Sequence, residues 1–356
     1  MTQHNNSQKL DFLIENNASF AIFRLPDSST IQFVMQCEGD TELMYEFEHL
    51  SGKNGFVIAP FRISEGTPIV IIRPDCTNID DVKSKDFFTS ERTEKNKTDN
   101  IDRFGYNKLF HRFYKPLNDG TLKKIVLSRS KTITKNRSFS PGEAFYRAID
   151  RYKHSYVYLV NTPISGTWLG STPEMLLTGS NNVWQTVALA GTRYPNKGNV
   201  SWDDKNLREQ HLVTSFILNQ LATFKITPEI NGPYTTRAAN LAHLRTDLVF
   251  NLTNTNNLGK LIKSLHPTPA VSGLPKEEAY RYIEEHEGYN RKYYTGFLGM
   301  IDLDNETNIY VNLRCMEIGK SLLTLFAGSG LVLSSTSKDE WKETEQKLKI
   351  MASIVN

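Results

Sequence analysis

The chain has 356 residues, 39% of them hydrophobic and 23% charged, with a formal net charge of +3. It is long enough for one large domain or two ordinary ones with a substantial core. The charged runs are mixed in sign, which gives no indication of nucleic-acid binding, and no apolar run approaches the length of a membrane span.

Targeting and cysteine patterns both point to the cytoplasm. The N-terminus has no apolar signal core. The three cysteines, Cys37, Cys76 and Cys315, are widely spaced and odd in number, which is typical of a reducing compartment, and no CxxC motif indicates zinc. We therefore expect a soluble cytoplasmic protein that does not bind a membrane.

The first 104 residues read as a sheet scaffold with an exposed loop. The pattern predicts a short helix over 10–17, and residues 83–103 are hydrophilic without periodicity, as in a surface loop. Strands bounded by Pro, Gly, Asp and Ser are predicted over 19–26, 30–37, 54–61 and 67–74.

Candidate functional residues begin after residue 105. A helix over 106–120 precedes a strand over 122–134, where Lys124 shares a face with Val126 and Ser128. A lysine in such a place is either a solvated charge at a strand edge or a functional group, and the strand alone leaves both open.

The next segment carries an acid in apolar company. A helix over 140–153 has proline in its first turn, and strands follow over 156–161, 167–179 and 183–195. Glu174 stands between Pro173 and three apolar residues, so desolvation would raise the pKa of its carboxyl group. Alternatively, it is a buried acid satisfied by a backbone group. Gly191 and Thr192 could hold a carboxylate through backbone N–H and hydroxyl groups.

A long helix is predicted over 203–224. On it, Glu209 shares a face with Leu212, Val213 and Phe216, which directs its carboxylate to the interior. An unpaired buried carboxylate is costly, so we expect a buried cation beside it, either a metal ion or an arginine.

Arginine appears in similar apolar company near the C-terminus. The pattern predicts a strand over 242–252, helices over 258–265 and from Pro275, and strands over 293–303 and 308–318. The last of these strands contains Arg314. Arg314 is therefore either a member of a buried ion pair or a bidentate carboxylate binder.

Residues 325–347 combine a glycine-containing strand with a helix. Gly328 and Gly330 allow close approach of a ligand to the backbone, and Ser337 with Glu340 predicts a capping box. Glu343 and Lys347 stand four residues apart on the helix. They form either a solvent-exposed pair or part of an anion and metal site.

Together, seven motifs resemble the chorismate-utilising enzymes, and within them the isochorismate synthases. The resemblance covers 105–356, while 1–104 is divergent, and we treat 1–356 as one chorismate-binding domain. It implies a mixed α/β (α+β) fold of two large packed, mainly antiparallel sheets surrounded by helices. The motifs are KIVLSR, STPEMLL, ALAGTR, LHPTPAVSGLP, EGYNRKYYTGFLG, NLRC and FAGSGLVLSSTSKDEWKETEQK.

By this resemblance, the enzyme adds water at C2 of chorismate while the C4 hydroxyl leaves, with Mg²⁺ as cofactor. Lys124 corresponds to the general base that activates water, and Glu174 to the general acid. Glu209 and Glu343 correspond to the magnesium ligands, with Lys347 beside Glu343 in the substrate site.

The remaining positions correspond to substrate binders. Arg314 and the backbone at Gly328 match the site of the enolpyruvyl carboxylate, with Tyr294 nearby. Gly191 and Thr192 match the residues that bind the ring carboxylate. His243 and Ala270 match residues that line the ring.

Three positions separate branches of the family. Ammonia-using relatives have glutamine at the position of Lys124, and aminodeoxychorismate synthases have a lysine nucleophile at that of Ala190. Ala270 replaces the threonine typical of salicylate synthases. The resemblance therefore favours isochorismate formation without a glutamine amidotransferase subunit, feeding menaquinone or siderophore synthesis. A salicylate synthase or a catalytically silent family member are the alternatives. Thr172 replaces the serine of the usual SPE motif, and the segment around Glu209 departs from the family's pattern.

Overall fold

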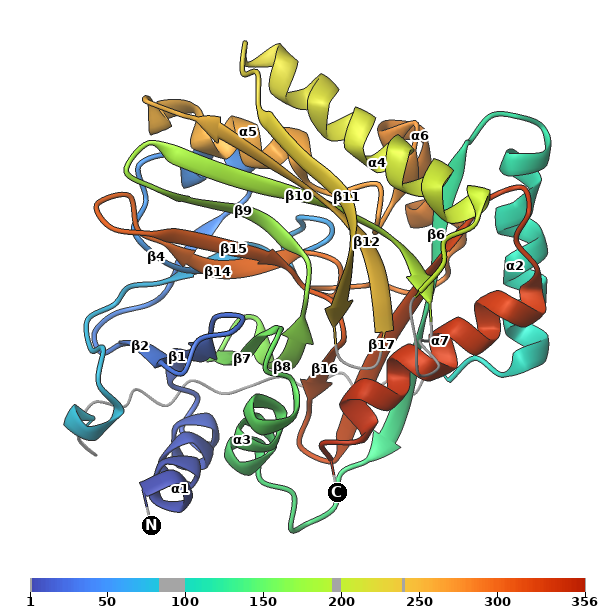
Figure 1. Ribbon diagram of the computed structural model, residues 1–356. Coiled ribbons are helices and arrows are strands. Elements are labelled where there is room, and N and C mark those ends of the chain that lie inside the picture. Colours follow the sequence, from blue (N-terminus) through green and yellow to red (C-terminus); the bar gives the residue numbers. More distant parts are fainter. Residues whose placement is uncertain (1, 83–99, 194–199, 239–240, 356) are drawn as a thin grey trace.

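Two antiparallel sheets form the centre of the molecule (Figure 1), whose computed structural model describes residues 2–82, 100–193, 200–238 and 241–355. The first sheet has eight strands in the spatial order β13 (Gly273–Leu274), β6 (Lys124–Thr134), β17 (Leu322–Leu331), β16 (Cys315–Ile318), β8 (Gly166–Thr172), β7 (Tyr156–Thr162), β1 (Ser19–Arg24) and β2 (Ile31–Gln36).

The second sheet has nine strands. Their spatial order is β11 (Glu229–Ala238), β12 (Leu241–Asn251), β10 (Val183–Arg193), β9 (Met175–Ser180), β15 (Thr307–Val311), β14 (Phe297–Ile301), β4 (Gly55–Ala59), β5 (Ile69–Ile72) and β3 (Glu42–Met44). Apolar side chains of both sheets, among them Phe23, Phe56, Tyr158 and Leu298, pack between them. The predicted fold class of two packed antiparallel sheets is confirmed.

Helices cover the outer faces of both sheets (Figure 1). On the eight-stranded sheet lie α1 (Thr2–Glu15), α3 (Pro141–Arg151) and α7 (Ser337–Ala352), whose apolar faces share one core with the strands. On the nine-stranded sheet, α4 (Asp204–Thr223) and α5 (Leu258–Leu265) do the same. The helices α2 (Arg103–Asn118) and α6 (Lys276–His286) pack around β6. None of the described helices is long and apolar enough to span a membrane.

The first 104 residues contribute strands to both sheets. Strands β1 and β2 end the eight-stranded sheet, and β3, β4 and β5 end the nine-stranded one. The four predicted strands are present, whereas the short β3 was not predicted, and neither was β11 later in the chain. Most of the loop predicted over 83–103 lies outside the described residues, and α2 begins at Arg103.

Two of the places where the chain passes from one sheet to the other lie side by side. The strands predicted over 167–179 and 308–318 are each broken, because β8 and β16 belong to one sheet and β9 and β15 to the other. Glu174 lies at the first junction and Arg314 at the second. The backbones are bonded crosswise, with the Val311 amide donating to Glu174 O at 2.9 Å and the Ser171 amide to Arg314 O at 3.1 Å. Arg314 is therefore not inside a strand, and its φ of +44° lies in the left-handed region.

Candidate active site

A cavity of about 580 Å³ lies between the two sheets at the end where β6 and β17 approach β10 and β12. Helices α4 and α7 contribute side chains to its wall. Every predicted site residue lines it except Thr192, whose side chain lies outside the described part of the chain. The lining residues from the predicted set are Lys124, Glu174, Gly191, Glu209, His243, Ala270, Tyr294, Arg314, Gly328, Glu343 and Lys347.

Lys124 is buried and paired with Glu209. Its Nζ lies 2.7 Å from Glu209 Oε1, and the Lys124 side chain is 1% exposed. Lys124 begins β6, which lies between β13 and β17, so the interpretation as a solvated edge lysine is wrong. The structure places a lysine, Lys124, beside Glu209, a cationic partner that the sequence did not predict. A Cβ atom at Gly330 would lie 3.0 Å from Lys124 Cε and 3.2 Å from Glu209 Oε1, so this glycine makes room for the pair.

Lys347 and Glu343 form a second ammonium–carboxylate pair. Lys347 Nζ lies 2.7 Å from Glu343 Oε1 and donates to Gly328 O at 2.9 Å. The side chains are only 20% and 25% exposed, which contradicts the solvent-exposed interpretation. The helix that carries them begins one residue earlier than the predicted cap implied: Thr336 is the N-cap and accepts a hydrogen bond from the Asp339 amide.

Glu174 has a very different environment. It is buried, and its Oε1 accepts a hydrogen bond from Thr268 Oγ1 at 3.0 Å. Desolvation raises the pKa of Glu174 to about 7, although Thr268 and the nearby cations Lys124, Lys347 and Arg314 act in the opposite direction. The direction agrees with the prediction from its apolar neighbours. Sequence reasoning missed Thr268, whose only signal was a hydroxyl between two prolines in a rigid turn.

His243 connects Arg314 to the turn at Gly191. Its Nε2 lies 2.7 Å from an Arg314 guanidinium nitrogen, and its Nδ1 lies 2.8 Å from Gly191 O. Because a guanidinium can only donate, Nε2 accepts and Nδ1–H donates to the carbonyl. Burial, followed by the charge of Arg314, lowers the pKa of His243 to about 3, so the imidazole is neutral. The sequence placed His243 beside the ring but gave no sign of this bridge.

The site offers oxygen donors that suit a hard cation. No group of three or more His, Cys, Asp or Glu side chains able to hold a metal occurs among the described residues. Mg²⁺, however, retains several waters and is commonly held by one or two carboxylates together with an anionic substrate. Glu209 on α4 and Glu343 on α7 line the same cavity and supply only oxygen. Their donor chemistry fits Mg²⁺.

Comparisons with known proteins agree on one family. A family model described as chorismate binding enzyme matches residues 69–356. The chain is 31% identical to isochorismate synthase EntC of Escherichia coli over 243 residues, 65% of this chain and 62% of that protein. Identity to isochorismate synthase MenF of Escherichia coli is also 31%, over 258 residues, 69% of this chain and 59% of that protein.

The alignments thus span about 60% of the length of these relatives. A crystal structure from Bacillus anthracis, assigned as the 2,3-dihydroxybenzoate-specific isochorismate synthase DhbC, superposes with a TM-score of 0.78. That superposition covers 98% of this chain and 99% of the other, at 26% identity.

Proposed function

Because the chain belongs to the chorismate-binding enzyme family, we propose that it converts chorismate to isochorismate. The observation that carries this proposal is that two groups suited to opposite proton transfers, Lys124 and Glu174, line one cavity between the sheets. Hydration at one ring carbon and loss of hydroxyl at another require a base and an acid as separate groups.

In the proposed reaction, Lys124 acts in its neutral amine form and takes a proton from a water molecule whose oxygen bonds to ring C2. Both ring double bonds shift, and the C4–O bond breaks as Glu174 delivers a proton to the departing hydroxyl. Water therefore enters and leaves once, and the net reaction is an isomerisation. The raised pKa of Glu174 suits this role, because a substantial fraction of the carboxyl groups is still protonated at neutral pH.

Binding of the substrate requires cations for its two carboxylates. Arg314, whose planar fork can form a bidentate pair, is proposed to bind the enolpyruvyl carboxylate with the backbone at Gly328 and with Tyr294 nearby. The turn at Gly191 and Thr192 is proposed to receive the ring carboxylate, and His243 and Ala270 to line the ring. When bound, Mg²⁺ held by Glu209 and Glu343 would neutralise substrate charge.

Two alternative functions predict different outcomes with chorismate. A salicylate synthase would form isochorismate and then expel pyruvate, whereas a silent family member would bind chorismate without converting it. Ala270 lines the cavity at the position where salicylate synthases typically have threonine, which favours release of isochorismate. A silent protein would have no need of both Lys124 and Glu174 in one cavity.

The test is to incubate the purified chain with chorismate and Mg²⁺ and to identify the products by chromatography and NMR. Isochorismate as the accumulating product supports the proposal, salicylate with pyruvate supports the second reading, and unchanged chorismate supports the third. Exhaustive chelation that leaves turnover intact would exclude the metal assignment.

The cellular setting is proposed on sequence grounds. We expect the enzyme in the cytoplasm, with its product feeding menaquinone or siderophore synthesis. Since water is the nucleophile, no glutamine amidotransferase subunit is expected. A deletion strain whose growth is restored by added menaquinone, or by an added siderophore, would identify the pathway.

A further inference from the structure

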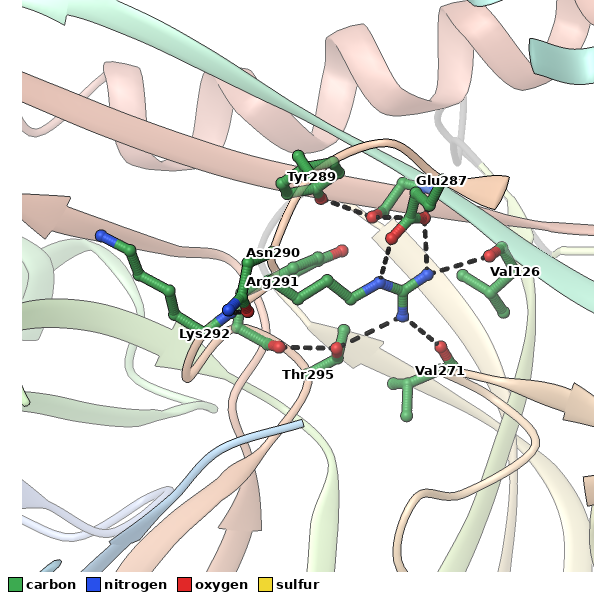
Figure 2. Close-up of polar contacts among 10 residues, drawn as sticks. Val126, Val271, Glu287, Tyr289, Asn290, Arg291, Lys292 and Thr295 are labelled. Atoms are coloured by element: carbon green, nitrogen blue, oxygen red, sulfur yellow. Dashed lines mark hydrogen bonds and ion pairs between the residues drawn. The ribbon is translucent and has the colours of Figure 1, made fainter. Parts of the chain in front are cut away.

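The motif EGYNR, which the proposed chemistry does not use, forms a buried ion pair behind the cavity wall (Figure 2). Arg291 Nε lies 2.5 Å from Glu287 Oε2, and a terminal nitrogen lies 2.7 Å from Glu287 Oε1. Both side chains are 1% exposed. Glu287 follows α6 directly, and Arg291 lies four residues further on in a loop, so the pair is not a surface helix pair.

Every N–H group of the Arg291 guanidinium is used. Besides the two bonds to Glu287, it donates to Val271 O at 2.8 Å, Val126 O at 3.0 Å and Thr295 Oγ1 at 3.3 Å. These five bonds exhaust the donors of an arginine. Figure 2 shows the guanidinium at the centre of this network. The acceptors Val126, Val271 and Thr295 lie on separate segments of the chain.

The carboxylate completes the network on the other side. Glu287 Oε1 accepts hydrogen bonds from the amide and the hydroxyl of Ser128, each at 2.8 Å. The Ser128 hydroxyl in turn lies 2.5 Å from the Tyr289 hydroxyl. Arg291 and Glu287 thus both bind β6, two and four residues beyond Lys124.

Arg291 takes the place of a missing strand partner. The short β13 pairs with β6 only through Gly273 with Ile125 and Leu274 with Lys124. One residue further along β6, the Val126 amide still donates to Ser272 O at 2.7 Å, but the Val126 carbonyl accepts from Arg291 instead. The guanidinium therefore holds the edge of β6 where the regular sheet ends.

The three segments held by Arg291 are also three walls of the cavity. Val126, Val271 and Thr295 all line it. Val126 stands two residues from Lys124, Val271 follows Ala270, and Thr295 follows Tyr294.

The segment that contains Val271 is also linked to Glu174, the proposed acid. The Val271 amide donates to Thr268 O at 3.0 Å, and the Thr268 hydroxyl bonds Glu174 at 3.0 Å. One buried cation therefore fixes the strand that carries Lys124 relative to the turn that orients Glu174.

We propose that Arg291, held by Glu287, is a positioning residue that sets the relative placement of Lys124 and Glu174. The inference rests on the proposed function. A buried ion pair is weak grounds for assuming a gain in stability, because desolvation offsets the attraction. A fixed planar fork with five donors, however, can hold three backbone segments at once, which no apolar pair of equal volume can do.

The variant Arg291→Lys tests this directly. Lysine keeps the charge beside Glu287 but donates at most three hydrogen bonds from one point, so at least one wall segment loses its restraint. Misplacement of reacting groups by about 1 Å can cost roughly a hundredfold in rate. We expect kcat for chorismate to fall by about that factor, with KM within about threefold of wild type, since Arg291 touches no substrate.

The matched control is Arg24→Lys. Arg24 on β1 is also a buried arginine, and it donates to the backbone carbonyls of Ile149, Tyr152, Lys153 and Ser155, away from the cavity. Its lysine variant should lose comparable stability but keep kcat. Both variants are assayed well below their melting temperatures.

The outcomes separate the two proposals. A fall in kcat confined to Arg291→Lys supports positioning. Unchanged kcat in that variant, an equal fall in Arg24→Lys, or a change confined to KM would overturn it while leaving the proposed function intact. If the wild-type chain does not isomerise chorismate, the proposed function itself is refuted, whatever the variants show.

If Arg291→Lys does not fold, Ser128→Ala replaces it. This change removes one hydrogen bond to Glu287 and leaves the guanidinium in place. A decrease of several-fold in kcat at unchanged KM then supports the proposal, and wild-type kcat overturns it.

Discussion

Glu174 and Glu209 line the same cavity with the same side chain, yet their surroundings are opposite. Glu174, at the junction of β8 and β9, has a threonine hydroxyl as its hydrogen-bond partner, and burial raises the pKa of its carboxyl group to about 7. On α4, the Glu209 Oε1 atom lies 2.7 Å from Lys124 Nζ. The different surroundings of two carboxyl groups in one cavity suit the different roles proposed for them, a proton donor in one case and a metal ligand in the other.

The largest effect is expected from removing the base. Lys124→Gln keeps a polar side chain of similar length but cannot accept a proton from water, and it leaves Glu209 without its cation. General base catalysis contributes about 10²–10⁴-fold, so we expect kcat to fall by about a thousandfold, measured by isochorismate formation with thermal melting as a check on folding. Near-wild-type turnover would move the base to Lys123 or another group. With high ammonia, an aminated product from this variant would show that position 124 helps to choose the nucleophile.

The substrate-binding cation should come next. Arg314→Ala leaves an anionic substrate group without its partner, a loss of roughly 2–5 kcal/mol. At about 1.4 kcal/mol per decade, kcat/KM should fall by roughly 1.4 to 3.6 orders of magnitude, without a change in the Mg²⁺ requirement.

Lysine at position 314 should not restore activity, because a point charge cannot reproduce the fork. A loss below tenfold in Arg314→Ala would contradict this placement of the substrate. So would a substrate complex in which Arg314 binds a protein carboxylate.

A smaller effect is expected at the metal site. Glu343→Gln keeps the shape of the side chain but weakens binding of a hard cation, so we expect at least a tenfold rise in the Mg²⁺ concentration for half-maximal activity, with a parallel rise in KM. The matched control is Glu345→Gln on the same helix, where the carboxylate pairs with Arg129 rather than facing the cavity. Equal Mg²⁺ dependence in the two variants would remove Glu343 from the metal site.

The smallest effect is a shift in pH dependence. Since Glu174 must be protonated to act as the acid, kcat/KM should fall as the pH rises above about 7. The hydrogen bond from Thr268 lowers the pKa of Glu174, so Thr268→Val should raise that pKa and extend activity to higher pH. A pH–rate profile of the two proteins measures the shift, and a shift to lower pH would contradict the assignment of Glu174 as the acid.

Local patterns in the sequence predicted most strands and the long helices, because alternation and amphipathic periodicity depend on neighbours along the chain. They did not predict the breaks at Glu174 and Arg314. Both segments continue as apolar strands beyond the break, so the pattern of apolar residues does not mark the change of sheet. The strand β11 was missed for the opposite reason, since it is an edge strand with exposed residues such as Ile230 and Tyr234.

Within the site, resemblance identified the residues but not their partners. The contacts of Lys124 with Glu209 and of His243 with Arg314 join residues that are 85 and 71 positions apart in the sequence. No local pattern encodes such pairs. Arg291 shows the same limit, because only the fold reveals that its guanidinium binds three segments.

The most direct test of the central claim uses water labelled with ¹⁸O. If water adds at C2 while the C4 hydroxyl leaves, wild-type turnover of chorismate in H₂¹⁸O will give isochorismate with one ¹⁸O atom, located at C2 by mass spectrometry and NMR. Product that retains the original oxygen at C2 would mean that the hydroxyl migrates within the substrate. That result would contradict the separate roles proposed for Lys124 and Glu174.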